Sequence, residues 1–314
     1  MKRLTLLLAS LLCMGTMFAQ SIVFITKDIS PDGLMKAYKA LGVELKGNVA
    51  VKISTGEGEG KNALKPNLIA PLVKSVHGTI VECNTAYPGN RVKSEDHWKA
   101  IKEHGYLDIA PVDIMDEEGE MKIPTRDKKH ISYDIVGTHL QKYNSMINLA
   151  HFKGHQMAGF GGVLKNQSIG VASSNGKTNI HTAGKAQKMS ELWDNLPEQD
   201  AFLESMAAAA QAVADYFKGE VVYIAVMNNM SIDCDCNAHP ANPEIKDYGI
   251  LASTDPVALD QACLDIIFNM KPEKGNDPRA LIERINKQHG THITEYAEKI
   301  GFGSRKYKLV SIDK

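Results

Sequence analysis

The sequence predicts an α/β protein with a mixed, largely parallel β-sheet and helices on both faces of that sheet. Strand-like and helix-like segments alternate at short spacing through the first half of the chain, as in folds where helices join parallel strands. The 314 residues, 43% of them hydrophobic, can fill one large core or two smaller lobes. No internal repeat and no Pro-rich or Ser-rich linker divides the chain. We therefore expect a single α/β domain over residues 20–314, which could consist of two lobes.

The elements of the first half are predicted from apolar runs and from residues that start or stop helices. Pro31 begins and Gly42 ends a helix expected over residues 32–41. Two more helices are expected over residues 67–76 and from Ser94 to His104. Short apolar runs predict strands over residues 22–25, 49–53, 79–82, 112–115 and 145–150. The charged stretch 117–129 is expected to be a surface excursion.

The second half contains a long helical stretch followed by further strands and helices. Residues 190–217 predict this stretch, with an interruption at Pro197. Asp255 followed by Pro256 is typical of a helix start, because proline fits the first turn. A basic pair of helices is expected over residues 278–300. The remaining apolar runs predict strands over residues 220–226, 249–252 and 308–312.

The N-terminus has the pattern of a secretory signal peptide over residues 1–19. A basic start is followed by an apolar run from Leu4 to Phe18 and by the small residue Ala19. This run is too short for a comfortable membrane span, and no later segment is apolar enough to form one. Cys13 raises the alternative of a lipoprotein, but Leu12 precedes it where a small residue is expected. We expect cleavage near Ala19 and a periplasmic or secreted protein.

Composition restricts the class of partner. The formal net charge is −1, and no Lys/Arg run is dense enough for a phosphate backbone, which argues against nucleic acid. We expect a small molecule or an ion as the ligand. Four cysteines remain after cleavage, and in an oxidising compartment they could form two disulfides. Cys263 lies on the apolar stripe of a helix and is expected in the core. Cys83 ends a strand and could be a core residue or a chemically active one.

A polar, glycine-rich cluster directly follows the strand expected over residues 145–150. Polar loops also follow Ile53 and Glu82, and ligands of open α/β sheets bind at the carboxyl ends of strands. The cluster supplies a histidine pair, basic and amide groups, and glycines: His151, Lys153, His155, Gly159, Gly161, Gly162, Lys165 and Asn166. We expect these residues to line a site on loops.

The glycines fit neither nucleotide-binding motif. Leu164 stands where the dinucleotide fingerprint requires glycine, and five residues rather than four separate Gly170 from Gly176 in the P-loop-like segment. Their exposed backbone amides could still hold a small anion beside Lys165 or Lys177.

Histidines and cysteines suggest a metal site. His151 and His155 are four residues apart, His181 is a third candidate, and Cys234 and Cys236 lie in the tetrapeptide Asp-Cys-Asp-Cys. Thiolate and imidazole together suit a single zinc or iron ion. The alternatives are loop histidines bonded to backbone, and a strained redox disulfide or two idle thiols.

Several motifs occur in a defined order: His151-Phe-Lys-Gly-His155, Gly159-Phe-Gly-Gly162, Lys165-Asn166, Gly176-Lys177, His181, Cys234-Asp-Cys236 and Ser253-Thr-Asp-Pro-Val-Ala-Leu-Asp-Gln261. This series resembles the family called domain of unknown function 362, or uncharacterised iron-sulfur centre proteins. The match runs from about Val49 to about Ile267.

The resemblance implies a ferredoxin-like insert with two four-iron clusters after the position of His181. This chain departs from the family there, because residues 182–233 contain no cysteine and one such cluster takes four thiolates. We therefore expect no four-iron cluster. The resemblance leaves an α/β domain with His, Lys and Cys motifs.

These observations give one leading hypothesis and two alternatives. The leading hypothesis is an exported protein that binds a metal ion or small anionic ligand, with redox or group-transfer chemistry as its enzymatic form. Its candidate residues are Lys153, Lys165, Asn166 and Lys177 for catalysis, Gly159, Gly161 and Gly162 for a cofactor, and His151, His155, His181, Cys234 and Cys236 for the metal. The alternatives are a non-catalytic binding protein that lost its clusters, and a thiol-disulfide protein.

Overall fold

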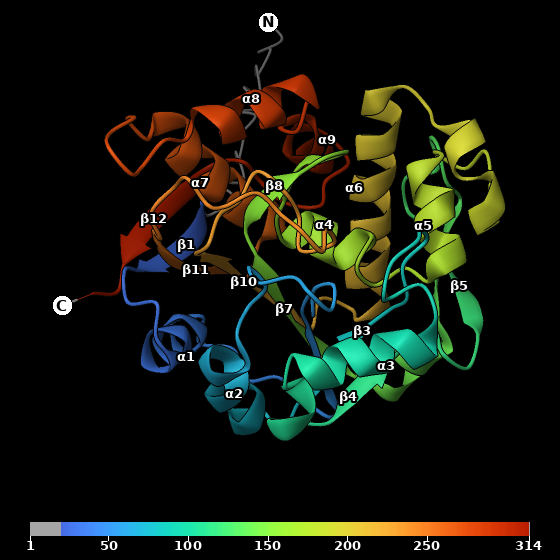
Figure 1. Cartoon of the computed structure of the whole chain (residues 1–314), viewed down its shortest axis with the longest axis horizontal. Helices are drawn as coiled ribbons and strands as arrows, with labels where there is room; N and C mark the ends of the chain where they lie inside the picture. Colours follow the sequence, from blue (N-terminus) through green and yellow to red (C-terminus); the bar gives the residue numbers. More distant parts are fainter. Residues whose placement is uncertain (1–19, 314) are drawn as a thin grey trace, which may run out of the picture.

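The computed structural model describes residues 20–313, so the predicted signal peptide over residues 1–19 lies outside the described residues. One eight-stranded sheet runs through the described chain (Figure 1). In spatial order it consists of β12 (Tyr307–Ser311), β1 (Ser21–Thr26), β11 (Gly249–Ser253), β10 (Val221–Met227), β7 (Ser145–His151), β2 (Val49–Lys52), β3 (Thr79–Glu82) and β4 (Val112–Ile114). β11 is antiparallel to both neighbours, and the other adjacent pairs are parallel. The prediction of a mixed, largely parallel sheet is confirmed.

Helices cover both faces of the sheet, as expected (Figure 1). One face packs against α1 (Pro31–Ala40), α2 (Pro66–Ser75) and α3 (Ser94–Glu103). The other face packs against α4 (Val163–Ser168), α5 (Ser174–His181), α6 (Gln199–Tyr216), α7 (Pro256–Asn269), α8 (Arg279–Lys287) and α9 (His292–Lys299). α6 begins two residues after Pro197, which confirms the predicted interruption. None of the helices within residues 20–313 is long and apolar enough to cross a membrane.

Alternation along the central strands divides the core into two layers. In β7, Ile147 and Leu149 belong to the layer under α1 and α2, whereas Met146 and Ala150 belong to the layer under α6 and α7. Side chains alternate between the faces of a strand, so a strand covered on both sides must be apolar throughout. This explains why the central strands have continuous apolar runs. Cys263 lies in the second layer, as expected.

Two small antiparallel sheets correct the sequence-based expectations. β5 (Glu120–Pro124) pairs with β6 (Tyr133–Gly137), so the stretch 117–129 is not merely an excursion. The sequence did not predict β5 because its alternation of apolar and polar residues is short, with only Met121 and Ile123 as apolar positions. β8 (Lys153–His155) pairs with β9 (Gly159–Gly161), so the central cluster folds as a hairpin followed by α4 rather than as a loop. The short 3-10 helices are η1 (Tyr106–Asp108), η2 (Thr138–Lys142), η3 (Met189–Glu191) and η4 (Trp193–Asn195).

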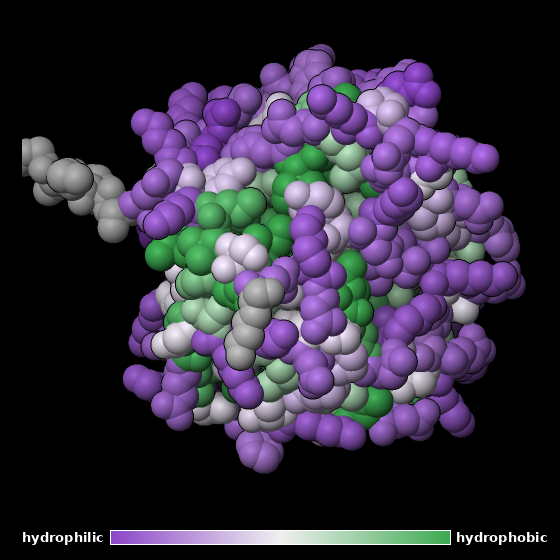
Figure 2. All heavy atoms as spheres, turned by 90° about the vertical axis from the view of Figure 1, so that its left-hand side faces the viewer, coloured by the Kyte–Doolittle hydropathy of each residue, from purple (hydrophilic) through white to green (hydrophobic). Residues whose placement is uncertain are grey.

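The edge of the sheet at β12 is partly apolar. Figure 2 shows this side of the molecule, where apolar residues gather within a mostly hydrophilic surface. Ile22, Phe268 and Leu309 are the exposed large hydrophobic residues of β1, α7 and β12. Lys308 stands on the edge strand beside Leu309, and a lysine there disfavours pairing with another sheet edge.

Asp255 joins the N-terminus of α7 to two other parts of the chain. Its Oδ1 accepts hydrogen bonds from the backbone N–H groups of Val257 and Ala258, at 2.9 and 3.1 Å. Its Oδ2 accepts from the Ser21 hydroxyl at 2.7 Å and from the Ser304 N–H at 2.9 Å. The residue therefore caps α7 and holds β1 and the segment before β12 in place.

We predict that Asp255→Ala lowers the free energy of unfolding by about 2 kcal/mol, because it removes the cap together with two tertiary hydrogen bonds. Ser30→Ala is the matched control, since the Ser30 hydroxyl caps α1 by accepting one hydrogen bond, from the Gly33 N–H. We expect Ser30→Ala to lower the free energy of unfolding by about 1 kcal/mol. Urea unfolding of both variants measures the difference. Equal losses would show that the bonds to Ser21 and Ser304 add nothing.

Candidate functional site

A polar cavity lies at the carboxyl ends of β2, β3 and β7, where the sequence predicts a site. Parallel strands end at the same edge of a sheet, so the segments that follow them meet there. A second cavity adjoins the first and shares Tyr87, Lys165, Ile169, Cys234 and Cys236 with it. The second cavity has a volume of about 480 Å³, which is in the range of small-molecule sites.

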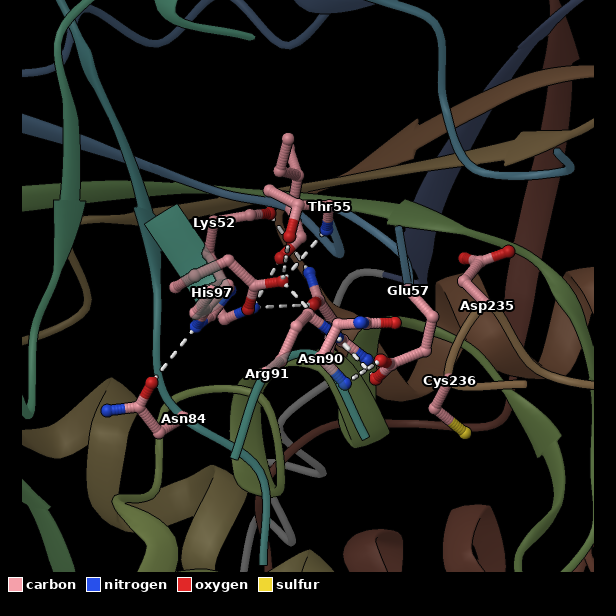
Figure 3. Close-up of polar contacts among 12 residues, drawn as sticks. Lys52, Thr55, Glu57, Asn84, Asn90, Arg91, His97, Asp235 and Cys236 are labelled. Atoms are coloured by element: carbon pink, nitrogen blue, oxygen red, sulfur yellow. Dashed lines mark hydrogen bonds and ion pairs between the residues drawn. The ribbon is translucent and has the colours of Figure 1, made fainter. Parts of the chain in front are cut away.

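Glu82, at the end of β3, connects the segments on one side of the cavity, where Lys52, Thr55 and Arg91 lie together (Figure 3). Its carboxylate accepts from Lys52 Nζ at 2.7 Å, from the Thr55 N–H at 2.8 Å and from Arg91 at 3.2 Å. Arg91 also donates to Glu57 at 3.0 Å. Burial alone would raise the pKa of Glu82, but the charges of Lys52 and Arg91 hold it at about 2. The carboxylate therefore stays charged although it is buried.

Asp235 is a second buried carboxylate that connects segments beside the cavity. Its carboxylate lies 3.0 Å from His151 Nδ1 and 2.8 Å from Lys153 Nζ. Its backbone carbonyl accepts from the Glu57 N–H at 3.0 Å. Burial opposes the charged form, yet His151 and Lys153 keep the pKa of Asp235 well below its usual range. Because Asp235 stands between Cys234 and Cys236, these contacts fix the position of both cysteines.

Three of the five predicted metal ligands come together. The side chains of His155, Cys234 and Cys236 place one donor atom each within 4.8 Å of one another, so this group could hold a metal ion. The cysteines of the described chain, Cys83, Cys234, Cys236 and Cys263, are all free thiols. Cys234 and Cys236 therefore present two sulfur atoms to the cavity rather than the disulfide that the sequence left open.

The hydrogen bonds of His155 define its protonation. Its Nδ1 accepts from the backbone N–H groups of Met157 and Ala158, at 3.1 and 3.0 Å. The neutral ring therefore carries its proton on Nε2, which lies 4.0 Å from Cys236 Sγ. A metal at Nε2 would have to displace this proton. Ligating histidines ordinarily donate from their second nitrogen, so the two sulfurs are better ligands here than His155.

The pKa values of the two thiols shift in opposite directions. A hydrogen bond from Cys236 and the nearby charge of Lys165 hold the pKa of the Cys234 thiol well below its usual range, against the effect of burial. The same hydrogen bond and burial raise the pKa of Cys236. The Cys236 N–H also donates to Cys234 Sγ at 3.4 Å. Cys234 is therefore deprotonated more readily than Cys236.

His151 and His181 do not belong to the group that could bind a metal. Both ring nitrogens of His151 are occupied, Nδ1 by Asp235 and Nε2 by the Asn228 carbonyl at 2.6 Å, so the ring has no lone pair to offer. This corrects the expectation for His151. His181 donates from Nδ1 to the Lys177 carbonyl at 2.7 Å, and its ring stacks on Phe202. It lines the second cavity beside His155.

The predicted catalytic residues divide into bonded and free groups. Asn166 donates to the Lys52 carbonyl at 3.0 Å and to Asn148 at 2.7 Å, so it ties α4 to β2 and β7. Lys153 is neutralised by Asp235. The ammonium of Lys177 donates to the Ala172 carbonyl at 2.5 Å. Within residues 20–313 the ammonium of Lys165 forms neither a hydrogen bond nor an ion pair.

The three glycines expected to bind a cofactor have different surroundings. Gly159 has φ +79° and packs against Gly290 and Ile285, away from the cavity. A Cβ on Gly162 would lie 2.2 Å from Asp260, whose carboxylate accepts from the first N–H groups of α4. Gly161 and Gly162 line the first cavity, and Gly159 does not. Close packing therefore accounts for Gly159 and Gly162.

The site also contains Lys52, Arg91 and Asp235, which were not predicted from the sequence. Lys52 and Glu82 each end an apolar strand, and both are almost completely buried. A charged residue that ends a buried strand is a usable signal, because burial requires a partner of opposite charge. The pairing itself could not be read, since Lys52 and Glu82 belong to different strands.

The described chain is thus an α/β protein whose sheet has, at its carboxyl edge, cavities lined by thiols, imidazoles and ammonium groups. The chain belongs to the family described as domain of unknown function (DUF362), which matches residues 49–265. The resemblance stated from the motifs is thereby confirmed. No curated protein matches the chain.

Two solved structures are similar to the chain at low identity. The lactate racemase apoprotein from Thermoanaerobacterium thermosaccharolyticum has a TM-score of 0.46 and 13% identity, covering 79% of this chain and 57% of that one. A Thermotoga maritima protein has a TM-score of 0.41 and 12% identity, covering 86% of this chain and 58% of its own. The chain thus spans less than two thirds of the length of either structure.

We predict that stability falls as the pH decreases from about 5 towards 2, in part because Glu82 must then take up a proton. A carboxyl with an ordinary pKa of 4.5 in the unfolded chain and about 2 in the folded chain contributes roughly 3 kcal/mol at neutral pH. That contribution is lost on acidification. Glu82→Gln should flatten this part of the curve of unfolding free energy against pH.

The matched control is Glu273→Gln, which removes an exposed carboxylate paired with Lys246. It should keep the wild-type slope, because solvent screens an exposed pair. Denaturant unfolding at several pH values gives both slopes. An unchanged slope in Glu82→Gln would show that Glu82 does not take up its proton on acid unfolding.

Proposed function

We propose that this protein binds a single zinc or iron ion through the sulfur atoms of Cys234 and Cys236, with His155 as a weaker third ligand. The observation that carries the proposal is the approach of these three donor groups to within 4.8 Å at the wall of a cavity. Two thiolates and one imidazole leave an open coordination position, as in catalytic zinc sites. The open position would face a ligand in the cavity.

The surroundings of the cysteines support this proposal. Metal binding requires deprotonated thiols, and the buried Cys234 already has a lowered pKa. Asp235 holds the backbone between the two cysteines through two ion pairs, so the sulfurs are positioned before any metal arrives. A pre-positioned pair loses less conformational entropy on binding than a flexible one.

A second function is favoured by a different observation. The neutral His155 directs its Nε2 proton towards the sulfurs, and Cys236 donates to Cys234, so the thiolate is stabilised without a metal. Such a thiolate could act in thiol-disulfide exchange. The experiment that follows separates the two functions.

We predict close to one zinc or iron ion per mature chain when the protein is prepared with reductant and without chelator. Cys234→Ser and Cys236→Ser should each remove most of the metal, and His155→Gln should lower affinity by a smaller factor, because its second nitrogen cannot donate. Elemental analysis together with a count of free thiols measures this. Cys263→Ala is the matched control, since Cys263 lies in the core on α7.

Two results would decide against the metal. A wild-type chain that takes up neither zinc nor iron, while Cys234 and Cys236 convert reversibly between dithiol and disulfide, would establish the thiol-disulfide function instead. Metal that persists in both cysteine variants would place the ion elsewhere in the protein.

We further propose that the protein acts in the periplasm or outside the cell, after cleavage near Ala19. The support is the N-terminal sequence, with its basic start and its apolar run from Leu4 to Phe18. We predict that the mature protein from a bacterial host begins at Gln20 by intact-mass measurement, and that Cys13→Ala has the same mature mass. An uncleaved chain in the cytoplasm, or a lipid attached to Cys13, would contradict the proposal.

A further inference from the structure

The first cavity contains more positive charge than its carboxylates neutralise. Five cationic side chains line it: Lys52, Arg91, Lys153, Lys165 and Lys177. Three of them are neutralised by ion pairs, Lys52 with Glu82, Arg91 with Glu57 and Glu82, and Lys153 with Asp235. Lys165 and Lys177 have no such pair within residues 20–313.

Lys177 is the more deeply buried of the two. Lys177 is 4% exposed, and its ammonium donates a hydrogen bond to the Ala172 carbonyl. Two carboxyls are near enough to interact with its charge. Burial raises the pKa of Asp134 to about 8, which favours the neutral form of this carboxyl at pH 7. Asp116 directs its oxygens to the backbone N–H groups of Asn84 and Ser174. Burying an ammonium with so little compensation is costly unless a ligand supplies the missing charge.

Lys165 stands where the two cavities meet. It lines both of them together with Cys234 and Cys236, and its charge acts on both sulfurs. Because neither Lys165 nor Lys177 forms an ion pair within residues 20–313, the cavity favours an anion over a neutral ligand.

We infer that the first cavity binds the carboxylate or phosphate group of a small organic anion, held by Lys165 and Lys177. The rest of the ligand would extend into the second cavity, where Met157, Ile169 and Trp193 provide apolar surface. This inference builds on the proposed function, because the anion would share its cavity with Cys234 and Cys236. The lysines, however, would bind the anion whether or not a metal is present.

Isothermal titration calorimetry with benzoate and with phenyl phosphate tests the inference, and benzamide is the neutral probe matched to benzoate. We predict that at least one anion binds the wild-type chain more tightly than benzamide, and the tighter anion identifies the head group. Lys165→Gln and Lys177→Met should each weaken it by about tenfold. Lys39→Gln, an exposed lysine on α1, should leave it unchanged. Circular dichroism establishes that the variants fold, and Lys165→Gln alone tests the inference if Lys177→Met does not fold.

The Cys234→Ala/Cys236→Ala double variant separates this inference from the metal. Anion binding that survives in it, and still depends on Lys165, supports the lysine site even if the wild type contains no metal. Binding that disappears in it would show that the anion depends on the two cysteines or on a metal that they hold, which overturns the lysine site and leaves the metal proposal intact. Equal affinity of the wild type for benzoate, phenyl phosphate and benzamide would overturn the inference whatever the metal content.

Discussion

The site depends on one buried carboxylate, that of Asp235. It stands between Cys234 and Cys236, and its ion pairs reach His151 at the end of β7 and Lys153 in β8. Breaking such a buried pair from one side costs about 3–5 kcal/mol, since the remaining charge has no partner. The contacts that hold Asp235 therefore also hold the two sulfurs. The polar groups around Asp235 stabilise a particular geometry of the site, whereas the apolar layers stabilise the fold.

Glu57 links this arrangement to the second buried carboxylate, Glu82. Its N–H donates to the Asp235 carbonyl, and its carboxylate pairs with Arg91, which also contacts Glu82. The segments that follow β2, β3 and β7 are thus connected through hydrogen bonds at one edge of the sheet. A parallel sheet brings these segments together, and the buried ion pairs fix how they face one another. The result is a cavity whose charged groups are positioned in advance, which is the condition for strong electrostatic binding.

Much of the fold could be predicted from the sequence, because the parallel sheet is buried on both faces and its strands are continuous apolar runs. The hairpin of β8 and β9 could not be predicted, since each strand has only three residues and Phe160 is the one large apolar residue among them. Within the site, His155, Cys234 and Cys236 were predicted as metal ligands from their residue types, and their side chains do lie close together. The sequence could not show that Asp235 and the Asn228 carbonyl occupy both ring nitrogens of His151, because residue types do not reveal which hydrogen bonds a ring makes.

The central claim is that the sulfurs of Cys234 and Cys236 bind a metal ion at this edge of the sheet. X-ray absorption spectroscopy at the metal edge, on the mature protein reconstituted with zinc, tests it most directly. Our account predicts two sulfur scatterers at about 2.3 Å, with the remaining ligands nitrogen or oxygen. A first shell made only of nitrogen and oxygen atoms would contradict it.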